Sequence, residues 1–179
     1  GDWNVLAGQY FCEYREKDHV VSPFPIPAWW RRFRAMDWGY NDPCAVLWFT
    51  VDGQGRAFVY RELYESRVLS SDVARRVREL SMGERIAYTV ASPDAWQERG
   101  MTGSADIRGE SIAEVFGNCG VPLLRADSAR VAGWQRVREY LKPADDGRPR
   151  LQIFSCCKNL LRTLPLLTFD EGTPRTCPT

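Results

Sequence analysis

The sequence predicts an α/β fold in which a mixed sheet is flanked by helices. Three short runs rich in aromatic and β-branched residues follow one another at 33–38, 45–51 and 57–63, which predicts three consecutive antiparallel strands. From residue 70 onward, apolar residues at helical spacing alternate with further strand-like runs. Because such an alternation builds right-handed crossovers, we expect the later strands to join the sheet in parallel.

Each element carries its own sequence signal. The turn Asp-Gly-Gln-Gly at 52–55 joins the second and third strands, and Ser70 or Ser71 is expected to cap a helix that runs to about Met82. Later strands are expected at 86–91, 121–124 and 151–154, and later helices at 111–116, 130–141 and 158–164. Crossover helices should cover the sheet and bury the strand residues Val46, Trp48, Val59, Ile86 and Tyr88.

The length of 179 residues and the mass of 20.5 kDa predict a single domain. Residues 1–32 mix aromatic and charged side chains without a sustained period and place three prolines within 22–27. We therefore expect 1–32 to be an arm or linker and 33–179 to be the folded domain.

The composition narrows the kinds of chemistry that the chain can carry. No apolar run approaches the roughly 20 residues of a membrane helix, and no secretory signal is visible, so a cytoplasmic location is expected. The chain has one histidine and six cysteines without a Cys-x-x-Cys pair, which argues against a Cys/His zinc site and a Ser-His-Asp triad and favours reduced thiols. A catalytic metal would therefore be held by oxygen. The net charge of +1 neither indicates nor excludes nucleic-acid binding.

Three carboxylates are candidates for metal ligands. Asp37 lies inside an otherwise apolar strand, where burial would require a cation; alternatively, it faces solvent or caps a turn with Gly39. Asp94 directly follows the fourth predicted strand, where open α/β sheets place their sites, although it could equally cap a short turn. Glu62, beside Tyr60 and Arg61 in the third strand, is a weaker candidate, because an ion pair with a nearby arginine would explain it equally well.

These residue types suit a particular reaction. Mg²⁺ and Mn²⁺ prefer oxygen ligands and retain water, so two or three aspartates can hold them. Two such ions about 4 Å apart stabilise the negative charge that phosphodiester hydrolysis builds on the attacking and leaving oxygens. The basic residues form no single run, but four lie where they could reach phosphate groups: Arg125, Arg130, Lys158 and Arg162.

Several segments, taken in order, resemble the C-terminal nuclease domain of large terminase subunits of tailed bacteriophages. The first pair is Gly-Asp-Trp at 1–3 and Gly-Gln-Tyr-Phe at 8–11. The others are Asp-Trp-Gly-Tyr-Asn-Asp-Pro at 37–43, Tyr-Arg-Glu-Leu-Tyr at 60–64, Ser-Pro-Asp-Ala-Trp at 92–96, Ser-Ile-Ala-Glu at 111–114 and Gly-Trp at 133–134. The resemblance covers nearly the whole chain.

The resemblance implies an RNase H-like fold that cleaves double-stranded DNA in the host cytoplasm with Mg²⁺ or Mn²⁺, expected as two ions. It implies Asp37 as the first ligand. Many members carry the second aspartate where this chain has Ser92, so Asp94 is the nearest carboxylate to that position. The third is expected beyond Thr179. Further implied partners are an upstream ATPase domain of the same subunit, of which no phosphate-binding Gly-rich motif is present here, the portal and the small terminase subunit.

Two other functions remain open from the residues. A junction resolvase or integrase-like nuclease would use the same carboxylates on a different DNA geometry. A module that grips DNA or docks on the packaging motor without cutting would explain the missing third carboxylate and the balanced charge.

Overall fold

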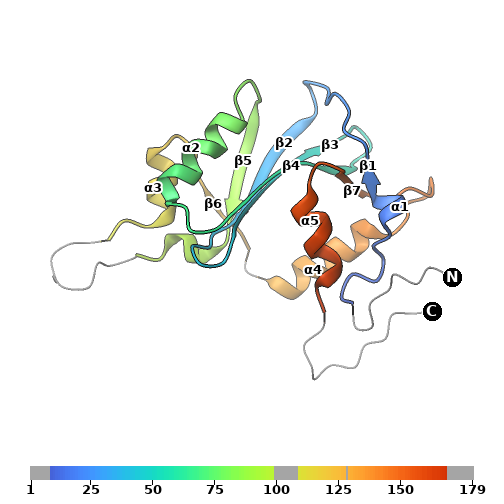
Figure 1. The fold of residues 1–179 in the computed structure, drawn as a ribbon. Helices are drawn as coiled ribbons and strands as arrows, with labels where there is room; N and C mark the ends of the chain where they lie inside the picture. Colours follow the sequence, from blue (N-terminus) through green and yellow to red (C-terminus); the bar gives the residue numbers. More distant parts are fainter. Residues whose placement is uncertain (1–8, 99–108, 128, 169–179) are drawn as a thin grey trace.

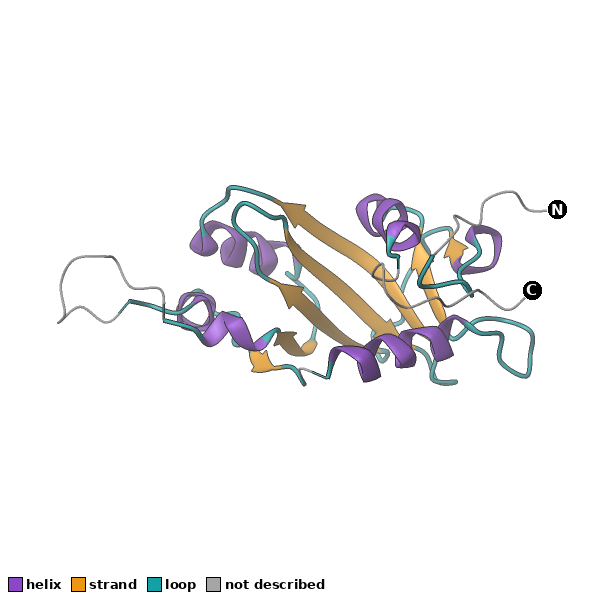
Figure 2. Cartoon of the chain, turned by 90° about the horizontal axis from the view of Figure 1, so that it is seen from below, coloured by secondary structure: helices purple, strands orange, loops and turns teal. Residues whose placement is uncertain are grey.

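The computed structural model describes residues 9–98, 109–127 and 129–168, and it shows a seven-stranded mixed sheet with helices on both faces (Figures 1 and 2). The strands lie side by side in the order β1-β7-β4-β3-β2-β5-β6. Their bounds are Val20–Val21 (β1), Arg31–Asp37 (β2), Cys44–Val51 (β3), Ala57–Glu65 (β4), Ile86–Ala91 (β5), Leu124–Arg125 (β6) and Leu151–Phe154 (β7).

The predicted antiparallel meander forms the centre of the sheet. Strand β3 pairs with β2 on one side and with β4 on the other, both antiparallel. Strand β5 then pairs with β2 in parallel, β6 with β5, and β7 with β4. The three parallel strands β2, β5 and β6 therefore present their carboxyl ends at the same edge of the sheet.

Two layers of helices cover the sheet. The helices are Glu16–His19 (α1), Ser70–Leu80 (α2), Ile112–Asn118 (α3), Arg130–Leu141 (α4) and Lys158–Thr163 (α5), with 3-10 turns at Pro93–Trp96 (η1) and Leu164–Leu166 (η2). Helices α2 and α3 lie against one face, and α4 and α5 lie on the opposite side (Figures 1 and 2). None of the described helices is long and apolar enough to cross a membrane.

The core confirms three of the five predicted buried residues and corrects two. Val46, Trp48 and Val59 are buried under the helices, as expected. Ile86 and Tyr88 are only partly buried, because β5 lies near the edge of the sheet and only Val90 and Ala91 pair with the short strand β6. The prediction that these two residues are largely buried therefore holds only in part.

A buried arginine fixes α2 against the sheet. Arg34, in the middle of β2, donates its Nε–H to the hydroxyl of Thr89 over 2.9 Å and donates from Nη1 to the hydroxyl of Ser81 over 2.8 Å. The Nη1 group also reaches the carbonyl of Val77 near the end of α2, over 3.4 Å. Burial lowers the pKa of Arg34, while the charges of Tyr60 and Glu84 counter that effect. The negative end of the helix dipole further favours the positive charge there.

The described part of the expected N-terminal arm belongs to the domain. Strand β1 extends the sheet by pairing in parallel with β7, and Phe11 and Tyr14 join the hydrophobic core. His19 is buried, and its Nε2 lies 2.8 Å from the carbonyl of Leu141. The segment Gly-Asp-Trp at 1–3 lies outside the described residues, so the link to an upstream domain stays an expectation.

Three local predictions need correction. The residue before α2 is Leu69, whose side chain makes no capping hydrogen bond, so neither Ser70 nor Ser71 serves as the expected cap. The short strand expected at 121–124 forms only at Leu124–Arg125. Cys44, Cys119, Cys156 and Cys157 are free thiols as predicted, whereas Cys12 is disulfide-bonded.

Candidate functional site

Asp37 is the last residue of β2 and lies at the edge where three parallel strands end. Alternation along β2 buries Arg34 and Met36 under α2 and α3 and turns Asp37 to the opposite face, where it is exposed. The position of this acid in an apolar strand therefore requires no buried cation. Its exposure instead leaves carboxylate oxygens accessible from solvent.

The neighbouring strand places a hydroxyl beside Asp37. Met36 is level with Ala91 in the parallel pairing of β2 and β5, so the next residue on β5, Ser92, is adjacent to Asp37. The Ser92 hydroxyl donates a hydrogen bond to Oδ1 of Asp37 over 2.9 Å. Ser92 is the position at which the resemblance expects the second aspartate.

Asp94 follows on the 3-10 turn η1, which begins directly after Ser92. The turn is closed by the backbone N–H of Ala95, which donates to the carbonyl of Ser92 over 3.1 Å. No side chain caps the turn, so the alternative role of Asp94 as an N-cap is not observed. The guanidinium of Arg125 lies over the ring of Trp96, 5.2 Å from its centroid, and joins η1 to the end of β6.

The carboxylate of Glu62 is hydrogen-bonded to the start of α5. Both of its carboxylate oxygens accept hydrogen bonds from the start of α5: Oε1 from the backbone and side-chain amides of Asn159 over 2.7 and 3.0 Å, and Oε2 from the backbone of Leu160 over 2.9 Å. A carboxylate at the positive end of a helix is stabilising. These contacts make Glu62 the anchor of α5, and neither an ion pair with an arginine nor a metal is needed to explain its position.

The four basic candidates lie in different places. Arg125 ends β6 beside η1, and Arg162 lies on α5 with its guanidinium 6.0 Å from the ring centroid of Tyr64. Tyr64 pairs with Ala45, which pairs with Asp37, so Arg162 stands at the same end of the sheet. Lys158 is exposed at the start of α5, and Arg130 begins α4, where its side chain is not among those described.

The loop after Asp37 requires a glycine at position 39. A Cβ atom added to Gly39 would lie 2.3 Å from the carbonyl oxygen of Asp42, which is closer than real Cβ contacts allow. This loop returns the chain to β3 at Cys44. Burial is the main cause that raises the pKa of the Cys44 thiol to about 12; a backbone hydrogen bond from Gly39 opposes the rise, and the charges of Asp37 and Glu65 add to it.

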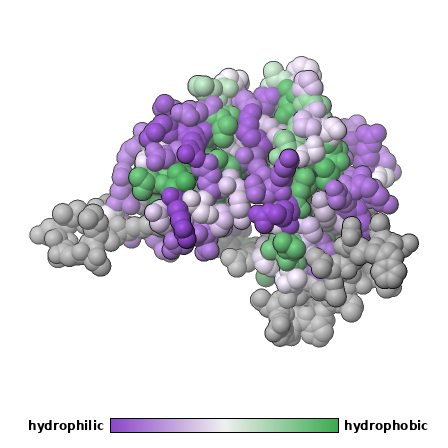
Figure 3. Space-filling model, in the orientation of Figure 1, coloured by the Kyte–Doolittle hydropathy of each residue, from purple (hydrophilic) through white to green (hydrophobic). Residues whose placement is uncertain are grey.

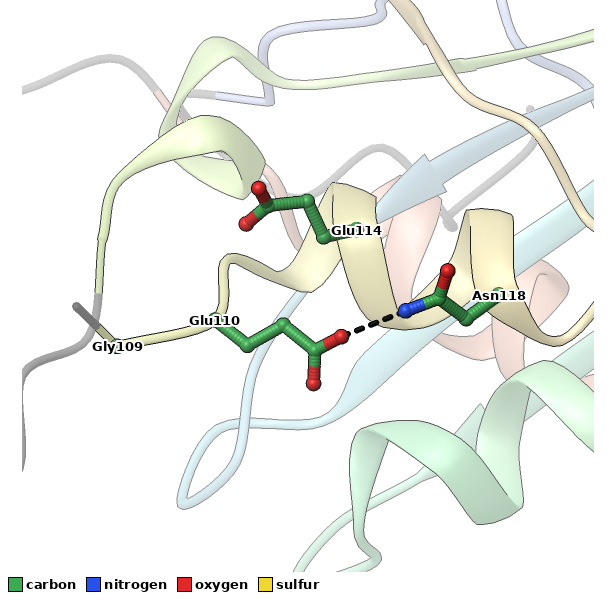
Figure 4. Close-up of a pocket in the computed structure, with 4 residues that line it drawn as sticks. All are labelled: Gly109, Glu110, Glu114 and Asn118. Carbon is green, nitrogen blue, oxygen red and sulfur yellow. Dashed lines mark hydrogen bonds between the residues drawn. The ribbon is translucent and has the colours of Figure 1, made fainter. Parts of the chain in front are cut away.

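Another acidic region lies on α3, in a pocket of about 310 Å³ (Figure 4). Glu110 accepts a hydrogen bond from the side chain of Asn118 over 2.7 Å, and Glu114 forms a capping box with Ser111. These carboxylates are engaged in holding α3. Among the described residues, no group of three or more His, Cys, Asp or Glu side chains is arranged to hold a metal ion.

Comparison with solved structures places this geometry in a known fold. The nuclease domain of the P22 large terminase superposes with a TM-score of 0.72 at 20% identity, over 92% of this chain and 81% of that domain. The large terminase nuclease of thermophilic phage G20c with bound zinc gives a TM-score of 0.58 at 16% identity, over 89% and 88% of the two chains. This chain has the terminase nuclease fold.

Longer proteins share the terminase nuclease fold over part of their length. The large terminase of a second thermophilic bacteriophage superposes with a TM-score of 0.72 at 14% identity over 93% of this chain, which corresponds to 39% of that protein. No family profile and no curated protein matches the sequence. The likeness therefore lies in the three-dimensional arrangement, and it confirms the predicted RNase H-like mixed sheet.

Proposed function

We propose that this chain is the metal-dependent endonuclease domain of a phage DNA-packaging terminase and that it cleaves concatemeric double-stranded DNA. The observation that carries the proposal is the junction of β2 and β5. There the exposed carboxylate of Asp37 is joined to Ser92, and Asp94 follows two residues later. Open α/β sheets place their sites at such carboxyl ends of parallel strands.

The side chains at this edge fit a hard divalent cation. Asp37 and Asp94 offer carboxylate oxygens, the Ser92 hydroxyl offers a further oxygen, and exposure of Asp37 leaves room for the water molecules that Mg²⁺ and Mn²⁺ retain. Bound there, two such ions would supply the charge that stabilises the attacking and leaving oxygens of a phosphodiester. The zinc in the G20c nuclease is consistent with use of a divalent metal by this fold.

Positive charge on both sides of Asp37 fits a polyanionic substrate. Arg125 lies on the β6 side of the strand ends, and Arg162 lies above Tyr64 on the β4 side. Guanidinium groups bind phosphate oxygens through several N–H donors at once. We assign these two residues to the DNA backbone on either side of the metal site.

The proposed surroundings follow from the longer relatives. Because this chain corresponds to 39% of the large terminase from the second thermophilic bacteriophage, we place an ATPase domain in the same subunit. We further propose the portal and the small terminase subunit as partners and the host cytoplasm as the place of action.

The deciding experiment compares the parent chain with its Asp37→Ala variant on linear duplex DNA in Mn²⁺. Metal-dependent cutting by the parent should be lost in the variant, while the unfolding temperature without metal holds or rises because acidic crowding is relieved. Binding of Mn²⁺ should be measured by calorimetry on both proteins, as a readout that does not need activity. Cleavage by Asp37→Ala at the parental rate would sink the proposal.

A non-catalytic module that grips DNA is the second candidate. It is favoured by the lack of a three-carboxylate metal group among the described residues. Binding of duplex DNA without cutting, in any divalent metal, would support it over the nuclease. Selective cutting of branched DNA would support a junction resolvase instead.

A further inference from the structure

A cluster of arginine and tryptophan side chains lies at the opposite end of the sheet from Asp37. It lines a cavity of about 590 Å³ formed by the residues that enter β2 and β5, which are Ala28, Trp29, Trp30, Arg31, Arg32, Arg85, Ile86 and Ala87. We call Trp29, Arg31, Arg32 and Arg85 the Trp-Arg cluster. In Figure 3 hydrophilic residues cover most of the face shown, and hydrophobic residues form several separate patches between them.

The positive charge of the Trp-Arg cluster has no carboxylate partner within the described residues. Arg31 and Arg85 are exposed and take part in no ion pair there. Glu84, next to Arg85, is engaged by Arg61 over 2.9 Å and by the hydroxyl of Tyr60 over 2.8 Å. The cavity itself is lined by no acid. Three guanidinium groups are thus gathered without neutralisation, which favours a polyanionic ligand.

Contacts of Arg32 and Trp30 with the rest of the domain fix the position of the Trp-Arg cluster. Arg32 donates from Nη2 to the carbonyl of Ile26 over 3.1 Å, and its Nε is buried without a partner. Trp30 packs inward on the ring of Phe58, with centroids 5.6 Å apart. Trp29, by contrast, is 83% exposed, an unusual position for so large an apolar side chain.

Arg31 connects the cluster with the face of the sheet that carries Asp37. Its guanidinium lies over the ring of Tyr88, 5.4 Å from the centroid, and Tyr88 stacks on Phe33 at 5.3 Å. Arg31, Phe33 and Asp37 are separated by even numbers of residues along β2 and therefore share one face. A guanidinium stacked on a ring keeps its N–H donors at its edges, where phosphate oxygens can accept from them.

We infer that the Trp-Arg cluster is a second contact for the backbone of duplex DNA, which would lie along β2 from Asp37 to Arg31. The inference rests on the proposed function for its choice of ligand. Six residue steps along a strand span roughly 20 Å, and one strand of B-DNA advances about 3.4 Å per nucleotide. Arg31 and Arg85 would therefore hold phosphates about six base pairs from the cutting position, with Trp29 packed against the sugars.

The test measures binding of a 30-base-pair duplex by fluorescence anisotropy in Ca²⁺, which separates binding from Mn²⁺-dependent cutting. The parent is compared with Arg31→Ala/Arg85→Ala and with a control of equal charge, Arg75→Ala/Arg78→Ala, on α2 at the other face of the sheet. Each lost phosphate contact should reduce the salt slope of the binding constant by about 0.9. The affinity ratio of parent to cluster variant should then shrink about tenfold between 50 and 200 mM salt.

The possible results separate this inference from the proposed function. A lower salt slope and weaker binding in the cluster variant alone, at an unchanged unfolding temperature, would support it. Equal binding by the cluster variant and the control would overturn it, even if the parent still cuts DNA and Asp37→Ala does not. A parent that binds no duplex would overturn both proposals. Trp29→Ala should weaken binding without changing the salt slope, because it removes contact area but no charge.

Discussion

The hydroxyl of Ser92 donates to the carboxylate of Asp37 over 2.9 Å and joins the ends of two parallel strands. This hydrogen bond puts an uncharged oxygen where a second carboxylate would crowd the first. In the proposed metal site, Ser92 therefore avoids the repulsion between two carboxylates but provides one anionic ligand fewer for a cation.

Replacing Ser92 by aspartate should make the domain less stable without metal and increase its affinity for a divalent cation. Two unit charges 4 Å apart in water repel by about 1 kcal/mol, so Ser92→Asp should lower the unfolding temperature without metal. Added Mn²⁺ should stabilise it more than it stabilises the parent, because the site gains a carboxylate. Thermal unfolding with and without Mn²⁺ checks both effects. Ser92→Ala is the control, and an equal response of the two variants to Mn²⁺ would contradict the assignment of this edge.

Glu62→Ala should weaken the fold but not the metal site. Loss of three hydrogen bonds to the start of α5 should cost about 1–2 kcal/mol of unfolding free energy. Affinity for Mn²⁺, measured by calorimetry, should stay at the parental value, unlike that of Asp37→Ala. A Mn²⁺ affinity that falls as far as in the Asp37 variant would restore Glu62 as a ligand.

Gly39→Ala should disturb the loop that follows Asp37. A Cβ atom at 2.3 Å from the carbonyl oxygen of Asp42 requires the backbone to shift, at a cost of roughly 1–3 kcal/mol. Cutting in Mn²⁺ should fall with stability, because Asp37 is anchored by this loop. Gly53→Ala is the matched control, since an added Cβ there meets no atom within 4 Å. Equal unfolding temperatures for the two variants would refute the steric argument.

The ion pair between Glu13 and Arg138 should make the stability of the domain depend on pH. Burial raises the pKa of Glu13. The hydrogen bonds and charge of Arg138, a backbone hydrogen bond and the charge of Lys142 together lower it by more than burial raises it, so the pKa lies below the ordinary 4.5. A lowered folded-state pKa gives stability that is present above the unfolded value and lost as pH falls through the folded value. Glu13→Gln should therefore lower the unfolding temperature at pH 7.

The Glu13→Gln variant also provides the comparison at low pH. As pH falls below 4.5 and through the lowered folded-state pKa of Glu13, the parent should lose its advantage, so the two unfolding temperatures should converge. A difference that stays constant from pH 7 to pH 3 would show that Glu13 acts through packing rather than charge.

Local pattern was enough to predict most of the sheet. The strands at 86–91 and 151–154 and the helix at 130–141 form where expected, because period and composition agree within each segment. The pairing of β1 with β7 could not be predicted, since two valines form a strand only when a partner about 130 residues away supplies hydrogen bonds. The place of Asp37 in β2 could be predicted from its own segment, whereas the contacts of Glu62 depend on α5, which follows much later in the chain.

The hydrogen bonds of buried Arg34 should also fix the register of β2 and so the side of the sheet on which Asp37 lies. A one-residue slip of β2 against its neighbours would exchange the faces of every side chain on the strand. It would drive Asp37 into the layer beneath α2 and carry Arg34 out to solvent, away from Thr89 and Ser81. The guanidinium of Arg34 reaches its hydrogen-bond acceptors in only one register of β2. A misaligned strand would therefore lose these hydrogen bonds and would also bury an unpaired carboxylate. The contacts of Arg34 therefore favour the one register of β2 in which Asp37 is exposed.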